Sequence, residues 1–199
     1  MNLDTLRQHP IDAVVIGASA GGIEALGQLL PALPARMRQP VLIVQHLPRD
    51  RPSLLVDIFA PRCALRVQEA EDKEPIVAGT IYFAPPDYHL LVDHGPSLAL
   101  SADALINFSR PSIDVLFESA ADVYGSHLLG LILSGANDDG SIGLAAVHRA
   151  GGITAVQAPN TATVPTMPAA AMKKTPVDFV LPLDQITGLL KALEPVHAA

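Results

Sequence analysis

Tryptophan is absent from this 199-residue sequence, and aromatic residues make up only 4% of it. Basic residues are also few, since 13 Lys and Arg stand against 20 Asp and Glu and give a formal net charge of -7. Nucleic-acid binding depends on basic side chains that neutralise phosphates and on aromatic rings that stack on bases. This composition therefore argues against nucleic acid as a partner.

Cysteine is equally scarce. Cys63 is the only one, so no disulfide can form within the chain and nothing argues for an oxidising compartment. Residues 1–10 lack the apolar run of a secretory signal, and later apolar runs such as 41–44 and 128–133 fall far below the roughly 20 residues that span a bilayer. These absences predict a cytoplasmic protein without membrane insertion.

Apolar residues, in contrast, are abundant: 49% of the chain is hydrophobic and only 17% is charged, which suits one well-filled domain. Short β-rich runs alternate with helical patterns, as is typical of parallel strands joined by helical crossovers. We expect strands at 13–16, 41–44, 128–133, 153–157 and 177–181, and helices at 23–30, 51–59, 112–124, 141–150, 165–173 and 184–193.

Between residues 65 and 100 the pattern changes. Short strand-like runs at 81–84, 88–92 and 97–100 are separated by Pro- and Gly-containing turns, which favours hairpins over crossovers. We therefore predict a three-layer α/β fold with a mainly parallel sheet, helices on both faces and a β-hairpin insertion. The expected organisation is an N-terminal tail at 1–10, one catalytic domain at 11–193 and a C-terminal tail at 194–199.

Reactive side chains follow three of the predicted parallel strands, at the carboxyl ends where open α/β sheets bind ligands. Ser19 follows the first strand, His46 follows the second, and Asp138 and Asp139 lie in the loop after the strand at 128–133. A serine in a tight turn, a histidine and an aspartate are the groups that supply a nucleophile, its base and a group that orients the base.

Ser19 also has ordinary interpretations. Its Gly-x-Ser-x-Gly setting, from Gly17 to Gly21, can present a hydroxyl on a sharp strand-to-helix bend. The same turn suits a plain serine N-cap or a pyrophosphate-binding loop. A dinucleotide site needs an acidic residue near the end of the second strand, but Gln45 and His46 stand there. No cofactor is therefore predicted.

The base and its orienting group each have a rival. His89 lies in an irregular stretch that could fold over the site, so it competes with His46, which could instead only cap a strand end. Asp138 and Asp139 precede Gly140, where a turn or helix start favours aspartate without catalysis. Carboxylates and histidines are not clustered at ligand spacing, so no metal site is predicted.

Five motifs occur in order along the chain. They are Gly17-Ala18-Ser19-Ala20-Gly21-Gly22, Gln45-His46-Leu47-Pro48, Ala84-Pro85-Pro86-Asp87-Tyr88-His89, Arg110-Pro111-Ser112-Ile113-Asp114 and Leu133-Ser134-Gly135-Ala136-Asn137-Asp138-Asp139-Gly140. Each is weak alone, but the ordered set, spread from about Ile11 to Leu193, resembles the catalytic domain of the CheB-type chemotaxis methylesterases.

The resemblance implies an α/β fold with a mainly parallel sheet and a triad of Ser19, His46 and Asp139, in an order that differs from that of the α/β-hydrolases. It implies hydrolysis of glutamate γ-methyl esters on chemoreceptor signalling helices, with glutamine deamidation in some members. A methylated chemoreceptor or receptor-like protein is the expected partner. The site residues expected to support the triad are Ala20, Gly21 and Ala136 as oxyanion donors and His89 and Arg110 at the rim.

Three features depart from the pattern of the family. Ala20 stands where threonine often follows the nucleophile, and Ala136 and Asn137 stand where methionine and glycine are usual. The receiver domain that members commonly carry in front is missing, so we expect no regulation by phosphorylation within this chain. A catalytically weak regulatory or interaction module with the same fold stays an alternative, as do a nucleotide-binding protein and a hydrolase of small esters.

Overall fold

A seven-stranded parallel sheet runs through the computed structural model, which describes residues 6, 9–48 and 52–193. Its strands, in their order across the sheet, are β3 (Arg66–Glu69), β4 (Thr80–Phe83), β2 (Val41–Gln45), β1 (Ala13–Ala18), β7 (Leu128–Ile132), β8 (Ile153–Gln157) and β9 (Phe179–Leu181). The chain builds outward from β1 on one side and then returns to place β7 on the other side of β1. The crevice between these two strands is the switch point at which open α/β sheets bind ligands.

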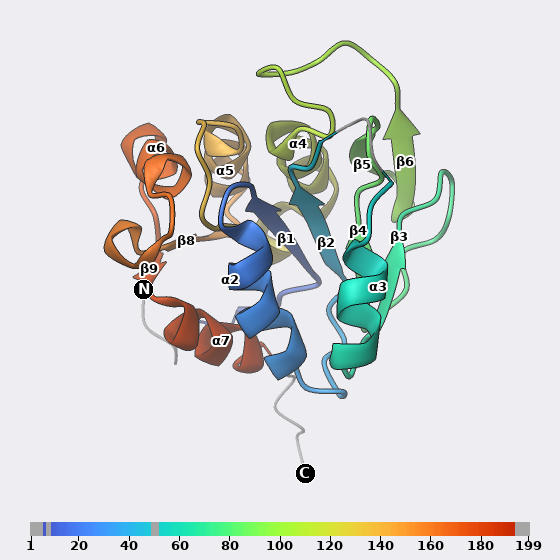
Figure 1. Ribbon diagram of the computed structural model, residues 1–199, viewed down its shortest axis with the longest axis horizontal. Helices are drawn as coiled ribbons and strands as arrows, with labels where there is room; N and C mark the ends of the chain where they lie inside the picture. Colours follow the sequence, from blue (N-terminus) through green and yellow to red (C-terminus); the bar gives the residue numbers. More distant parts are fainter. Residues whose placement is uncertain (1–5, 7–8, 49–51, 194–199) are drawn as a thin grey trace.

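Helices cover both faces of the sheet (Figure 1), so the fold class predicted from the sequence is confirmed. One face carries α2 (Gly22–Leu29), α3 (Leu55–Phe59) and α7 (Leu183–Lys191), and the other carries α4 (Ile113–Tyr124), α5 (Ser141–Arg149) and α6 (Thr166–Lys174). Short 3-10 turns lie at Leu30–Ala32, Ala60–Arg62, Gly125–His127 and Pro159–Thr161.

Each face of the sheet has its own apolar core because side chains alternate along every strand. In β1, Val14 and Ile16 pack toward α2 and α7, whereas Ala13 and Val15 pack toward α4 and α5. All residues of β1 are buried, as expected for a strand that is covered on both faces.

The predicted hairpin insertion consists of β5 (His89–Asp93) and β6 (Ser97–Ser101), which pair in antiparallel fashion. It lies against α4, where the backbone N–H of Val92 donates a 3.1 Å hydrogen bond to the Ser119 hydroxyl. The hairpin therefore extends the helical layer on one side of the sheet and leads into the loop of residues 102–112.

The expectation that residues 81–84 belong to a hairpin is wrong. Residues 81–83 form most of β4, a fully buried strand that runs parallel to both β2 and β3, and Ala84 follows it. The edge strand β3, which precedes β4 in the chain and pairs with it, contains Arg66, Gln68 and Glu69. This polar sequence has no clear strand pattern, so β3 was not predicted. Because the connection from β3 to β4 also lacks a helix, the local pattern looked like that of a hairpin.

Two other predictions lie partly outside the described residues. The helix expected at 51–59 begins at Leu55, where the Ser53 hydroxyl accepts the Leu55 N–H at 3.2 Å; residues 49–51 are not described. Most of the N-terminal tail and all of the C-terminal tail are also outside the described residues, but Leu6 is buried in the core at 1% exposure. In the part of the chain that is described, no helix is long and apolar enough to cross a bilayer.

Helices α4 and α5 approach each other closely at Gly143, where a Cβ atom would lie 2.5 Å from Phe117 Cβ and 3.0 Å from Asp114 Cα. Gly143→Ala is therefore expected to lower the free energy of unfolding by about 1–3 kcal/mol, as overpacking does. Gly188→Ala in α7 is the matched control, because a Cβ there meets nothing within 4 Å and helix propensity alone favours alanine. Urea unfolding measures both, and equal effects would contradict the close approach.

Candidate active site

The register of the sheet places Ser19 beside His46. Ala18 is paired with Gln45, and the His46 N–H continues the ladder with a 3.0 Å hydrogen bond to the Ala18 carbonyl. On the other side, the Ser19 N–H donates to the Ser134 carbonyl at 2.9 Å. Three strand ends therefore meet at Ser19, on the crevice where the chain reverses across the sheet.

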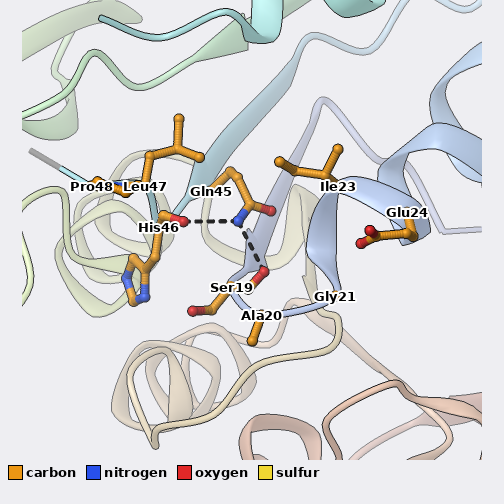
Figure 2. A pocket seen from close by; sticks show the side chains of 9 residues that line it. All are labelled: Ser19, Ala20, Gly21, Ile23, Glu24, Gln45, His46, Leu47 and Pro48. Atoms are coloured by element: carbon orange, nitrogen blue, oxygen red, sulfur yellow. Dashed lines mark hydrogen bonds between the residues drawn. The ribbon is translucent and has the colours of Figure 1, made fainter. Parts of the chain in front are cut away.

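A hollow of about 460 Å³ opens at this point, and Figure 2 shows the Ser19 side chain pointing toward the His46 ring. Within the described chain the Ser19 hydroxyl makes no hydrogen bond, so nothing holds it away from a substrate. The residues that line the hollow are Ser19, Ala20, Gly21, Ile23, Glu24, Gln45, His46, Leu47 and Pro48.

His46 is hydrogen bonded to the third predicted residue: its Nε2 atom lies 2.9 Å from Asp139 Oδ2. The His46 side chain is 13% exposed and that of Asp139 is fully buried. A carboxylate can only accept, so Nε2 carries the proton and Nδ1 is the ring nitrogen that can accept one. Asp138 is exposed in the same loop, so burial separates the two candidate aspartates.

The Asp139 carboxylate lies at the start of α4 and occupies the place of a helix cap. It accepts hydrogen bonds from the backbone N–H groups of Ile113 at 2.8 Å and Asp114 at 3.1 Å. It also accepts the Ser112 hydroxyl at 2.8 Å and the Gly140 N–H at 3.1 Å. An anion is favourable there because the first N–H groups of a helix lack partners within the helix.

These contacts decide the charge of Asp139. Burial raises its pKa, but the hydrogen bonds from His46, Ile113 and Ser112 and the charge of His46 outweigh burial and hold the pKa below its usual value. Asp114, the next carboxyl, behaves in the opposite way: burial and the nearby Asp139 charge raise its pKa to about 6, despite a hydrogen bond from the Gly143 N–H. The pKa values of these two neighbouring carboxyls are thus shifted in opposite directions.

His89, the rival base, is occupied by the backbone. Its Nδ1 accepts the Ser112 N–H at 3.1 Å, so its Nε2 carries the proton and donates to the Ala104 carbonyl at 3.1 Å. The side chain is 2% exposed, and neither nitrogen is left to accept a serine proton. His89 therefore supports the start of α4 and the loop above it.

Arg110 connects the two ends of the loop of residues 102–112 by hydrogen bonds. Its Nε and Nη2 atoms donate to Asp87 Oδ1 at 3.1 and 2.8 Å, and its Nη1 donates to the carbonyls of Ala102 and Asp103 at 2.7 and 2.8 Å. Arg110 also lines a second, smaller hollow of about 80 Å³, which has His46 in its wall. Arg110 thus lies near His46.

The three expected oxyanion donors are not equally placed. Ala20 and Gly21 line the larger hollow, and Gly21 has a φ of +77° at the start of α2, a conformation that glycine adopts without strain. Ala136 is exposed in the neighbouring loop and is not one of the residues that line the hollow. The turn at Ala20 and Gly21 is therefore better placed than the loop at Ala136 to donate hydrogen bonds to an oxyanion.

Gln45 is a site residue whose role the sequence analysis missed. Its side chain is 4% exposed, and its Nε2 donates to the backbone carbonyls of both Ser19 and His46, each at 3.0 Å. Ser112, at the N-cap position of α4, makes no side-chain cap hydrogen bond, and its hydroxyl donates to Asp139 instead. The sequence did contain a signal that could have identified Gln45: it is a polar residue at the end of a buried strand, directly before the candidate base His46.

A serine hydroxyl and a histidine held by a buried aspartate, at the switch point of a parallel α/β sheet, form the arrangement that serine hydrolases use. Among the described residues, no group of three or more His, Cys, Asp or Glu side chains is placed to hold a metal ion. The fold and the arrangement of these three side chains therefore resemble those of the serine hydrolases.

Comparisons with known proteins identify the family. The model of the CheB methylesterase family matches residues 14–190, so the chain belongs to this family. A putative protein-glutamate methylesterase/protein-glutamine glutaminase from Leptospira interrogans is 45% identical over 183 residues, which cover 92% of this chain and 95% of the relative. The crystal structure of the Thermotoga maritima CheB methylesterase catalytic domain matches with a TM-score of 0.88 and 33% identity, covering 92% of this chain and 98% of that one.

Longer relatives match as well. A Caulobacter vibrioides protein-glutamate methylesterase/protein-glutamine glutaminase is 41% identical over 181 residues and 89% of this chain. A Clostridium acetobutylicum protein of the same description is 37% identical over 181 residues and 91% of this chain. The match covers 52% of each of these two relatives, so this chain spans about half of their length.

The raised pKa of Asp114 predicts a pH-dependent stability. The pKa of an unfolded aspartate is about 4, and that of Asp114 in the folded state is about 6. Between these two pH values, Asp114 binds more protons in the folded protein than in the unfolded one. The contribution of Asp114 to the free energy of unfolding therefore falls as pH rises through this window. Urea unfolding from pH 4 to 7 should show a smaller fall for Asp114→Asn than for the wild type.

Asp122→Asn, at an exposed position of the same helix, is the control for the loss of a negative charge. Asp139 acts in the opposite sense, because a lowered pKa contributes stability that is lost only as pH falls below about 4. A wild type and an Asp114→Asn variant with the same pH dependence between 4 and 7 would contradict the assignment to Asp114.

Proposed function

We propose that this protein is a protein-glutamate methylesterase that removes methyl groups from glutamate γ-methyl esters of chemoreceptors or receptor-like signalling proteins. The observation that carries the proposal is the hydrogen-bonded pair of His46 and the buried Asp139, beside the Ser19 hydroxyl in one hollow. The names of the relatives supply the substrate class. The proposal places the enzyme in the cytoplasm, with the receptor signalling helices.

In the first half of the proposed reaction, the Ser19 oxygen attacks the ester carbonyl and His46 Nδ1 takes the serine proton. His46 Nε2 already donates to Asp139, so the imidazolium that forms lies against a carboxylate. Because the pKa of Asp139 is held low by its hydrogen bonds, this carboxylate stays ionised and stabilises the charged ring.

The tetrahedral intermediate then expels the methoxy group, which leaves as methanol with the proton from His46. The glutamyl group remains on Ser19 as an acyl-enzyme. In the second half, His46 removes a proton from a water molecule that attacks this ester, and the glutamate carboxylate is released as the Ser19 hydroxyl forms again. A glutamine side chain would follow the same steps and release ammonia, as the glutaminase part of the relatives' names suggests.

The oxyanion of the intermediate is assigned to the amides of Ala20 and Gly21, with Ala136 in the neighbouring loop as a further donor. The Ser19 carbonyl accepts Gln45 Nε2 at 3.0 Å, and the Ala20 carbonyl accepts the Ser134 hydroxyl at 2.7 Å. In a trans peptide the N–H points opposite to the C=O. The N–H groups of Ala20 and Gly21 therefore point away from these partners. Since the donors are backbone atoms, the alanine at position 20 does not remove them.

Substitutions of the proposed triad test the mechanism directly. Ser19→Ala and His46→Gln are each expected to lower methanol release from methylated chemoreceptors of the same cell by about 1,000-fold or more. His89→Gln should lower it far less, because both ring nitrogens of His89 are bonded to the backbone. Circular dichroism of each variant verifies folding. Unchanged turnover in Ser19→Ala would remove this serine from the mechanism, and a larger loss in His89→Gln than in His46→Gln would reverse the assignment of the base.

The orientation of the oxyanion amides can be tested at Ser134, a fully buried residue that acts through the Ala20 peptide. Ser134→Ala releases the Ala20 carbonyl, so we expect kcat to fall by about tenfold, or 1.4 kcal/mol in the barrier, with little change in KM. Ser119→Ala removes comparable hydrogen bonds within α4 and the hairpin and should leave kcat unchanged. A selective rise in KM in Ser134→Ala would contradict a role in the transition state.

A further inference from the structure

Phe108 occupies an unusual place at the tip of the loop of residues 102–112. Its side chain is 93% exposed, and its φ of 60° and that of Asn107, 48°, are both left-handed. Ile106 and Ser109 close this two-residue turn with two backbone hydrogen bonds of 3.2 and 2.8 Å. Such turns normally carry glycine at the second central position. A phenylalanine here combines a strained backbone with an exposed apolar ring.

The turn is held in place by the protein beneath it. Asn107 Nδ2 donates at 3.1 Å to the carboxyl of Asp114, which is 3% exposed, and Arg110 binds the carbonyls of Ala102 and Asp103 at the other end of the loop. Figure 1 shows this loop, between β6 and α4, rising above the carboxyl ends of the strands. The loop therefore lies on the side of the molecule where the strands end and the active site opens.

Phe108 also lies next to the proposed base. The small hollow of about 80 Å³ is lined by His46, Leu47, Phe108, Ser109, Arg110 and Pro111, and His46 also lines the larger hollow that holds Ser19. At about 80 Å³, the small hollow is too small to hold a substrate of its own. Leu105 and Ile106, at 42% and 41% exposure, extend the apolar surface along the same loop.

We propose that Phe108 is a docking residue for the polypeptide that carries the methyl ester, and that its ring packs between apolar side chains of a helical substrate segment. A small ester fills only the hollow at Ser19 and gains nothing from a ring on the loop above, whereas a protein substrate must pass over this rim. Buried aromatic side chains are also frequent anchors of protein interfaces. Phe108 thus selects protein over small esters; this inference rests on the proposed function.

The test compares two substrates of the same site, a methylated chemoreceptor and p-nitrophenyl acetate. Burying a phenylalanine ring on docking predicts that Phe108→Gly lowers kcat/KM for the receptor by about 10- to 100-fold, mainly through KM. Turnover of p-nitrophenyl acetate should be unchanged. Glycine adopts a left-handed φ without strain, so the melting temperature should not fall, and Phe108→Trp should keep receptor turnover.

Val77→Ser is the matched control, because Val77 is 49% exposed but precedes β4 (Thr80–Phe83), at the amino end of the strand and not at the carboxyl ends where the site lies, and should leave both substrates unaffected. Equal receptor turnover by the wild type and Phe108→Gly would overturn the inference alone. A wild type that releases no methanol from the receptor would overturn the proposed function and the inference with it. A second copy of the chain is the other partner that could bind Phe108, and light scattering tests for it. A wild-type dimer that Phe108→Gly converts to a monomer would assign the ring to a dimer interface and overturn the inference.

Discussion

The carboxylate of Asp139 receives five hydrogen bonds, from His46, Ser112, Ile113, Asp114 and Gly140. These donors come from the end of β2, the start of α4 and the loop after β7, which are distant in sequence. A buried charge is tolerated only when it is paired and hydrogen bonded. Conversely, the first N–H groups of α4 need an acceptor. The helix and the proposed triad therefore depend on the same ion.

Much of the candidate site could be predicted because it depends on strand ends, which leave a pattern in the sequence. Ser19, His46 and Asp139 each follow a buried β-rich run, and the carboxyl ends of parallel strands lie at one edge of the sheet. The contacts that distinguish between candidates could not be predicted. The exposure of Asp138, and the backbone partners of both His89 nitrogens, arise from tertiary packing that no short sequence window contains.

The fold was predictable to a similar degree and for a similar reason. Strands covered on both faces, such as β1 and β8, are apolar runs that stand out in the sequence. The edge strand β3 contains three polar residues and one apolar residue, so it lacks a strand pattern, and its parallel pairing with β4 depends on a neighbour rather than on its own composition. Phe108 escaped attention as well, because its significance lies in its exposure and its left-handed backbone.

Gln45 joins the two halves of the proposed machinery, because one amide nitrogen holds the carbonyls of both Ser19 and His46. The backbone ladder continues through the same residues. The spacing between nucleophile and base is therefore a property of the central sheet, where every residue of β1 and β2 is buried; core strands of this kind are generally the last to open. On heating, this spacing would persist while surface loops loosen, and it would be lost when β1 and β2 separate.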